Sequence, residues 1–401
     1  MNPTIEQVDP RILGMRLQEA RKSAGMTQSE AADHLGMSRT TIVAIEKGER
    51  RVSSHEIIQF AKLYRRSVSE LLSQRVVTDS FVPQFRAAQK ELDPSFERAA
   101  GELQTLSENY VELERILGTP LIRRFPPEYD TRGGTADRIA EDVATAERNR
   151  LGVGDGPIGN LRGRLENDVG LRIFYFPMES RIAGLFAYND LLGACVGVNS
   201  KHPRDRRNWT LAHEYGHFLM TRYQVEVTIL TTDTKMGSKE RLADNFAKCF
   251  LMPGTGLNRR FSELHRAGAK GITLADVFNL ANLYQVSVQA LVLRLEDLAR
   301  LPAGTWQRLS VEGVKVQQAH RLLGIDANPP LQELLPPRYV SLAVEAFRKE
   351  HLSEGQLAKF LRTDRVSARL QVEQLEKEIH LEDGGSFTPI APDLAQPLGG
   401  R

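Results

Sequence analysis

The segment Trp209–Met220 constrains the fold most, because its polar residues recur at the spacing of one helical turn. In a helix, His213 and His217 stand at positions i and i+4, with Glu214 beside them, among apolar neighbours. Two imidazoles on one helical face can ligate zinc, and the carboxylate can accept a proton from the water that the metal activates. We therefore predict a buried helix with a Zn²⁺ site. A surface helix that happens to carry two histidines is the alternative.

A second predicted helix, Lys239–Pro253, supplies acidic side chains downstream. Glu240 and Asp244 lie one turn apart on one face, opposite Phe246 and Phe250. Two histidines and one glutamate would leave a tetrahedral zinc ion one position for water, as a hydrolase requires. Asp244 would then orient a ligating imidazole. The alternative is an ordinary solvated helix face.

The two segments together resemble the ImmA/IrrE family of zinc metallopeptidases. The resemblance rests on Arg207–His217 followed by Glu240–Pro253, and it covers about residues 135–300. It implies zinc bound by His213, His217 and Glu240, with Glu214 as catalytic base. Leu242 departs from the family pattern, where many members carry a second glutamate. The family also implies that repressor proteins are cleaved in response to stress such as DNA damage.

Composition narrows the class of protein. A chain of 401 residues predicts two or three domains. No run of eighteen apolar residues appears, and the N-terminus lacks the pattern of a signal peptide, so we expect a cytoplasmic protein without a membrane partner. Cys195 and Cys249 give no disulfide framework. Residues 11–75 hold twelve Lys or Arg and seven Asp or Glu, which gathers positive charge where phosphate would be met.

Residues 11–75 are expected to form five short helices. Thr27 to Glu30 is a capping box that begins one helix, and Ser38 caps a second helix, Arg39–Lys47, which Gly48 ends. Two helices around a tight turn that contains glycine form a helix-turn-helix, and its second helix enters the major groove of DNA. A small helical protein-interaction bundle is the alternative.

This segment resembles the Xre (Cro/C1-type) helix-turn-helix family, through Met26–Ala32 and Thr41–Gly48. The resemblance implies double-stranded operator DNA as partner. The residues that would face DNA are Gln28, Ser38, Arg39, Thr40 and Thr41. Arg39 is the candidate for reading a guanine edge, and Lys47, Arg50 and Arg51 are candidates for phosphate contacts.

The remaining segments complete a mainly α, multidomain chain. Residues 76–134 are expected to be a helical connector, in which Phe96–Leu117 is either a homodimer face or packing against the next domain. In the α+β peptidase domain, residues 135–300, three strands are expected at Leu171–Met178, Gly184–Tyr188 and Ala194–Val198, with turns at Ala183-Gly184 and Asn189-Asp190. Residues 301–382 should be a helical C-terminal domain and residues 383–401 a disordered tail.

Two weak internal repeats lie outside the first helix-turn-helix. Ile272–Leu291 resembles Val52–Leu71, and Ser353–Leu361 resembles the first helix-turn-helix. We interpret both later copies as helical scaffolding. Arg362, Arg365 and Arg369 leave open a basic recognition helix in the last copy.

The sequence therefore predicts a DNA-binding transcriptional regulator with a zinc-dependent endopeptidase domain. Its substrate would be a repressor protein, either the chain itself or a partner, and single-stranded DNA is a candidate activator. The alternative is a non-proteolytic regulator or antitoxin, whose peptidase-like domain senses or binds a partner.

Overall fold

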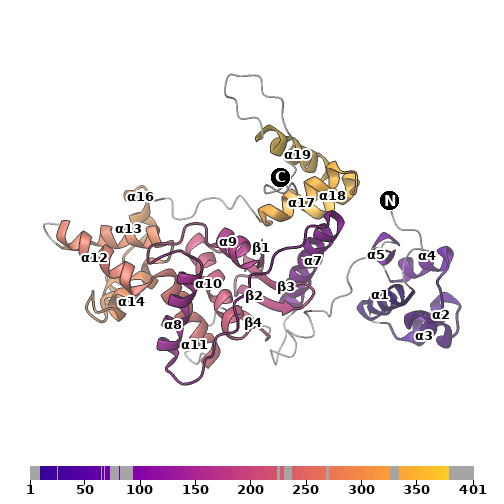
Figure 1. Ribbon diagram of the computed structural model, residues 1–401, viewed down its shortest axis with the longest axis horizontal. Helices are drawn as coiled ribbons and strands as arrows, with labels where there is room; N and C mark the ends of the chain where they lie inside the picture. Colours follow the sequence, from indigo (N-terminus) through magenta and orange to yellow (C-terminus); the bar gives the residue numbers. More distant parts are fainter. Residues whose placement is uncertain are drawn as a thin grey trace, which may run out of the picture. The chain divides into compact units, whose positions relative to one another are not determined.

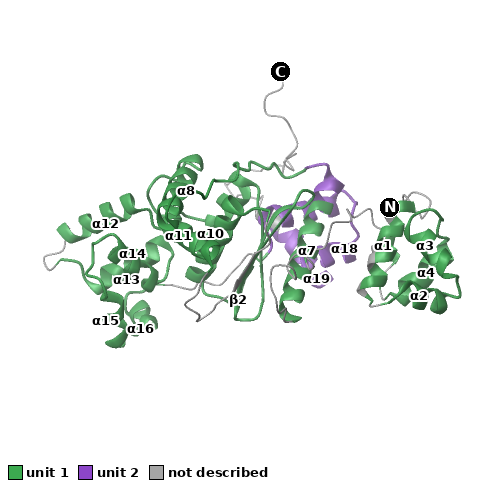
Figure 2. Ribbon diagram, turned by 90° about the horizontal axis from the view of Figure 1, so that it is seen from below, with its two compact units in different colours: residues 1–112, 120–334 green, residues 113–119, 335–401 purple. Residues whose placement is uncertain are grey.

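The computed structural model describes residues 10–24, 26–64, 66, 68–72, 81, 94–223, 226–229, 237–267, 271–325 and 334–378. Contacts divide the chain into two compact units, residues 1–112 with 120–334 and residues 113–119 with 335–401 (Figure 2). These units do not follow the five predicted segments, whose limits stay a prediction. The predicted tail, residues 383–401, lies outside the described residues. Among the helices that are described, none is long and apolar enough to cross a membrane.

Five short helices form the N-terminal part, as predicted (Figure 1). They are α1 (Pro10–Ser23), α2 (Gln28–Leu35), α3 (Arg39–Glu46), α4 (Ser54–Leu63) and α5 (Val68–Leu72). Their buried apolar side chains form a core of their own, which includes Leu17, Ile42, Ile45 and Phe60. Burial of these faces holds the helices together, because helices of this length are marginal alone in water.

The predicted caps of α2 and α3 are present. Thr27 Oγ1 accepts a hydrogen bond from the Glu30 amide at 3.2 Å, and the Glu30 carboxylate accepts one from the Thr27 amide at 2.7 Å. Ser38 Oγ accepts from the Thr41 amide at 3.0 Å. Between the helices, Gly36 adopts φ +65°, which a residue without Cβ does at little cost. The helix-turn-helix geometry is therefore confirmed.

A four-stranded sheet forms the centre of the peptidase-like part. Its strands are β1 (Arg172–Phe176), β2 (Ile182–Asn189), β3 (Gly193–Asn199) and β4 (Glu226–Ile229), in the order β1-β3-β2-β4. Strand β1 is parallel to β3, and the other pairs are antiparallel. The three predicted strands are present, and β4 joins them. Strand β4 was not predicted, because four residues carry too little periodicity to detect.

Helices cover both faces of the sheet. Ile173 and Tyr175 of β1 belong to the core that also contains residues of α10 (Arg204–Met220). Phe174 points the other way, and its ring meets Tyr110 of α7 (Pro94–Leu117) edge-on at 6.2 Å between centroids. Residues on a strand alternate between faces, so both faces are buried at β1. Helix α7 contains the predicted connector helix Phe96–Leu117. It packs against the sheet, which is one of the two predicted alternatives for this helix.

Helix α10 lies on β2, β3 and β4, and α11 (Ser238–Leu251) packs between α10 and α8 (Ala136–Arg150) (Figure 1). The aromatic rings of Tyr215 and Phe246 meet at 5.9 Å and hold α10 against α11. The contact between α10 and α11 brings the two predicted site helices together. In the chain, α8 is followed by a short helix α9 (Leu161–Arg164) and a π-helical turn η2 (Leu165–Val169), which precede β1.

The turn predicted at Ala183-Gly184 is wrong. Both residues lie inside β2, where Gly184 pairs with Val198 of β3 and Thr228 of β4. The pairing of β2 with β4 is irregular between Ile182 and Gly184, as at a β-bulge. Glycine in a strand can mark either a turn or a close approach, and here it marks a close approach. The turn predicted at Asn189-Asp190 does connect β2 to β3.

In the described part of the chain, eight further helices follow α11. They are α12 (Gly254–Ala267), α13 (Leu274–Tyr284), α14 (Val288–Asp297), α15 (Thr305–Val311), α16 (Val316–Leu322), α17 (Pro337–Arg348), α18 (Glu354–Leu361) and α19 (Arg365–Glu378). Helix α15 contacts α14, and α16 contacts α13. The last three helices belong to the second unit, where α18 contacts both α17 and α19.

The pair α18–α19 repeats the spacing of α2–α3. The matching positions are the first caps Thr27 and Ser353, the left-handed residues Gly36 and Arg362, and the second caps Ser38 and Asp364. The charge pattern differs, however. Glu354 stands where α2 has Gln28, and Glu354 pairs with Arg369 at 2.9 Å. An acidic side chain at this position would repel phosphate, which agrees with the interpretation of this copy as scaffolding.

Candidate metal centre and nucleic-acid interface

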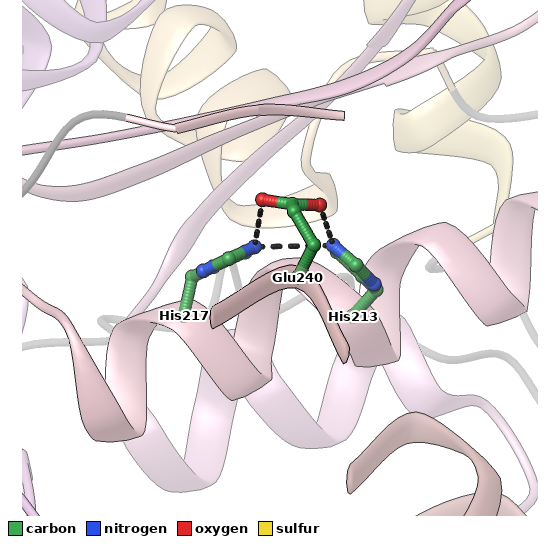
Figure 3. Close-up of side chains that lie close together, drawn as sticks. All are labelled: His213, His217 and Glu240. Carbon is green, nitrogen blue, oxygen red and sulfur yellow. Dashed lines mark hydrogen bonds and ion pairs between the residues drawn. The ribbon is translucent and has the colours of Figure 1, made fainter. Parts of the chain in front are cut away.

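Three side chains converge where α10 meets α11 (Figure 3). His213 and His217 are buried, and their Nε2 atoms lie 3.1 Å apart. The Glu240 carboxylate reaches both rings, with Oε2 at 3.2 Å from Nε2 of His213 and Oε1 at 3.3 Å from Nε2 of His217. Within the described residues, this is the only group of three or more such donors close enough to hold one metal ion.

The other ring nitrogens also have partners. His213 Nδ1 lies 2.8 Å from Oδ1 of Asp244, the aspartate that the sequence placed one turn from Glu240. His217 Nδ1 lies 3.3 Å from Oγ1 of Thr221. Thr221 was not among the predicted site residues, since a threonine one turn beyond a histidine is too common a pattern to indicate a site. Both rings are therefore held at the edge that faces away from Glu240.

The acidic neighbours change the protonation of the cluster. Burial lowers the pKa of His213, but Asp244, Glu240 and Glu214 outweigh it and raise that pKa to about 10. Burial likewise raises the pKa of Glu240, whereas hydrogen bonds from both imidazoles bring it far below its usual range. The carboxylates of Glu240, Asp244 and Glu214 thus surround His213 with negative charge, which favours a cation at this position. A bound metal ion would supply such a positive charge.

Glu214 is fully buried between α10 and the sheet. A Cβ built on Gly184 of β2 would lie 2.4 Å from Oε1 of Glu214 and 2.5 Å from the Thr210 methyl group. No side chain at position 184 fits unless something moves, so glycine makes room for the carboxylate. Sequence reasoning missed this role, although the available signal was a glycine within an apolar run that pairs on both sides.

A second buried carboxylate, that of Glu147 in α8, binds α10 through Tyr215. Glu147 of α8 accepts hydrogen bonds from Tyr129 at 2.8 Å, from Arg150 at 2.8 Å and from Tyr215. Tyr215 lies between the two histidines in sequence but on another face of the helix. Burial and the nearby Glu147 raise the pKa of Tyr215 well above its usual value, so its hydroxyl remains a donor. This network ties α8 to the helix that carries the histidines.

The predicted DNA-facing residues lie around the start of α3. Ser38, Arg39 and Thr40 are exposed, and Thr41 is half-buried. Ser38 Oγ is shared among the Thr41 amide and the hydroxyls of Thr40, at 2.7 Å, and Thr41, at 2.9 Å. Arg39 is thus the long side chain that leaves the helix start toward solvent.

The basic residues after α3 divide into two kinds. Lys47 and Arg51 are exposed. Arg50 donates a hydrogen bond to Oε1 of Glu56 at 2.7 Å, so a glutamate already neutralises part of its charge. The structure therefore favours Lys47 and Arg51 over Arg50 for contacts with phosphate.

A buried ion pair holds the three helices of the motif. Glu46 of α3 accepts from Arg21 of α1 at 2.6 Å and from Gln28 of α2 at 2.8 Å. Gln28, which the sequence placed at the DNA, is thus fixed by Glu46 and only half-buried. Sequence reasoning did not find this pair, because Arg21 and Glu46 are far apart in the chain and each alone resembles a surface residue.

Family models identify both domains. Residues 17–71 match a model described as Helix-turn-helix, and residues 166–296 match the peptidase M78 model, described as IrrE N-terminal-like domain. The chain joins an Xre-type helix-turn-helix to an ImmA/IrrE-type peptidase-family domain. Both predicted resemblances are confirmed, and the second match contains the whole histidine–glutamate cluster.

Whole-chain comparisons add little. No curated protein matches the chain. Among solved structures, the apo form of ComR from S. thermophilus aligns over 92% of this chain and 97% of its own, at 11% identity and a TM-score of 0.16. That score is too low to carry an argument about fold or function.

Proposed function

We propose that this helix-turn-helix, ImmA/IrrE-type chain is a transcriptional regulator whose peptidase domain is a zinc-dependent endopeptidase. The observation that carries the proposal is the convergence of three donor atoms beside a buried carboxylate. Two imidazole nitrogens and the Glu240 carboxylate face one point, and Glu214 follows His213 directly on α10. Zinc sites of hydrolases use this donor set.

The residues present fit a zinc ion. His213, His217 and Glu240 would hold it, which leaves one coordination position for water or substrate. Zinc bound there would lower the pKa of a water molecule and polarise a peptide carbonyl. Asp244 and Thr221 would keep the two rings turned toward the metal.

Glu214 would act as the general base and acid. Its carboxylate would accept a proton from the attacking water and return that proton to the amine nitrogen of the leaving peptide. Complete burial strengthens such electrostatic interactions, because water does not screen them. The close contact with Gly184 would hold the carboxylate in one place.

A substrate would bind as an extended peptide. In the sheet of described residues, β4 is the terminal strand beside β2, and the peptide would add to its outer edge. An added strand there would run along the sheet that lies on α10.

The N-terminal domain would bind double-stranded operator DNA. Helix α3 would enter the major groove, where Arg39 would donate two hydrogen bonds to a guanine. Lys47 and Arg51 would contact phosphates and add affinity without sequence preference.

The fusion suggests what is cleaved. We propose a repressor protein in the cytoplasm, either the chain itself, as a sister subunit of a homodimer, or a separate regulator. A stress signal such as single-stranded DNA after damage would start the reaction.

Metal analysis next to a cleavage assay tests the proposal. Purified protein reconstituted with zinc should hold about one equivalent, and His217→Ala should lose it. Zinc binding without cleavage of any repressor would favour the alternative, a non-proteolytic regulator or antitoxin that uses the domain to bind a partner. Less than half an equivalent of zinc in the wild type would overturn the metal site.

A further inference from the structure

The hydrogen bonds of the Nδ1 atoms of His213 and His217 determine which ring nitrogen carries the proton. A neutral imidazole ligates a metal through the nitrogen that lacks a proton, and its other nitrogen is then a donor. Both Nε2 atoms face the point that Glu240 also faces, so a zinc ion held there would be bound through Nε2, and both Nδ1 atoms would then be the donors. Each Nδ1 then needs a partner that accepts its hydrogen bond.

Asp244 is such a partner, because its carboxylate oxygens accept hydrogen bonds, and Trp209 holds it in place. The indole Nε1 of Trp209 lies 3.2 Å from Oδ1 of Asp244, the same oxygen that lies 2.8 Å from Nδ1 of His213. An indole N–H donates and never accepts, so it requires an oxygen with free lone pairs. Two donors on one oxygen also restrict rotation of the carboxylate. Trp209 and His213 stand one turn apart on α10, and Asp244 reaches both from α11.

Thr221 becomes an acceptor in another way. Its hydroxyl donates to the carbonyl oxygen of His217 at 3.2 Å, where α10 ends. Because the single hydroxyl proton is used there, Oγ1 can only accept from Nδ1 of His217, at 3.3 Å. The backbone supports this position, since the Thr221 amide donates to the same carbonyl at 2.7 Å.

We propose that Trp209 and Thr221 are positioning residues that fix His213 and His217 as the tautomers with protons on Nδ1. This inference rests on the proposed zinc site and names two residues that the motif does not include. Trp209 acts through Asp244, whereas Thr221 acts on its histidine directly. In this role neither residue is a metal ligand.

Substitutions that remove one hydrogen bond test each residue. Thr221→Val keeps the shape of the side chain but offers no acceptor, so zinc affinity should fall about 10- to 100-fold, as when other partners of ligating histidines are removed. Thr221→Ser keeps the hydroxyl and should restore the wild-type affinity. Trp209→Phe keeps an aromatic ring without N–H, and we expect a loss of about tenfold, at the lower end of that range.

Trp306→Phe is the matched control, because Trp306 is the other tryptophan and also packs half-buried against the same core. Zinc affinity is measured on the full chain by competition with a chromophoric chelator. Tautomers of the zinc-loaded protein are read from long-range ¹H–¹⁵N correlations of the histidine rings. Wild type and Trp306→Phe should show two Nδ1–H, metal-bound Nε2 rings.

The outcomes separate this inference from the proposed function. If the wild type binds no zinc, the metal site itself fails, and the inference fails with it. If the wild type binds zinc but Thr221→Val matches Thr221→Ser and Trp209→Phe matches Trp306→Phe, the inference is overturned and the metal site stands. Equal losses from Thr221→Ser and Thr221→Val would show that packing, not the hydroxyl, matters.

Discussion

Gly184 and Glu214 are in contact, although one lies in the middle of a strand and the other in the metal-site helix. A Cβ at position 184 would come within 2.4 Å of Oε1 of Glu214. The distance between β2 and α10 is therefore set by a glycine, and the carboxylate occupies the space that a side chain would fill. This contact links the sheet to the proposed chemistry.

Gly184→Ala should impair proteolysis more than zinc binding. The added methyl group overpacks the interface, which costs about 1–3 kcal/mol of stability, and it displaces the Glu214 carboxylate. His213, His217 and Glu240 lie away from the methyl group, so one equivalent of zinc should remain. Zinc stoichiometry, thermal unfolding and cleavage rate are measured together. Gly101→Ala is the control, because a Cβ built there meets no atom within 4 Å beyond its chain neighbours and the nearby backbone of its own helix. Undiminished cleavage by Gly184→Ala would show that this contact does not position the base.

Glu214→Gln should keep zinc and lose proteolysis. An amide matches the shape of a carboxylate but cannot accept the proton of the attacking water. Metal content by atomic spectroscopy and cleavage of a repressor substrate are the two measurements. Full activity would assign the base to another residue, and loss of zinc would mean that Glu214 is a ligand.

Arg39→Ala should weaken binding to the operator by about 1–3 kcal/mol and relax the preference at one base pair. Arg51→Ala should weaken all sequences alike and reduce the salt dependence of binding. Arg365→Ala, at the start of α19, should change neither the affinity for DNA nor its salt dependence. The reason is that the pair α18–α19 carries two acidic residues, Glu354 in α18 and Asp364 as the cap of α19. Titrations of operator and scrambled DNA at several salt concentrations give all three results. Loss of operator binding in Arg365→Ala would identify α19 as a second recognition helix.

The helix-turn-helix should lose stability in acid through Glu46. Burial raises the pKa of Glu46, but hydrogen bonds from Arg21 and Gln28 lower it below its usual value of 4.5. A carboxylate with a lowered pKa in the folded state stabilises the fold above the unfolded pKa, and this stabilisation is lost as the pH falls through the folded pKa. Protection factors of α1–α3 amides, which are corrected for the intrinsic pH dependence of hydrogen exchange, should therefore fall below about pH 4.5. Glu46→Ala should cost about 3–5 kcal/mol at pH 7, because it leaves Arg21 buried without its carboxylate partner, and its protection factors should depend less on pH. Protection factors that do not change between pH 7 and pH 3 in the wild type would contradict this role.

DNA binding and proteolysis should be coupled. If operator binding favours one state of the peptidase domain, ligands of that domain must change the affinity for DNA by the same factor. A coupling of about 1–3 kcal/mol corresponds to a shift of about 5–150-fold. Operator DNA is titrated against Glu214→Gln protein with and without a tightly bound peptide. Cleavage by the wild-type protein, of its own chain and of repressors, is assayed with and without single-stranded DNA. An unchanged affinity, together with cleavage that ignores nucleic acid, would leave two tethered but independent domains.

The sequence alone determined the parts of this protein that depend on local spacing. A helical turn relates His213 to His217, and Glu240 to Asp244, so each pair could be placed on a face before the fold was known. The caps at Thr27 and Ser38 are also local, because a side chain there bonds an amide three residues on. The family resemblance added that the histidine segment, Arg207–His217, and the acidic segment, Glu240–Pro253, belong to one site.

Only the tertiary structure decided the contacts between segments that are distant in the chain. The assignment of Asp244 to His213 and of Thr221 to His217 depends on how α10 and α11 cross and where α10 ends. Gly184 was predicted in a turn, because a glycine gives the same local signal whether the chain bends or another element approaches. The Arg21–Glu46 pair could not be predicted either. Both charges become buried only when α1 packs on α3, and no pattern in either helix specifies that contact.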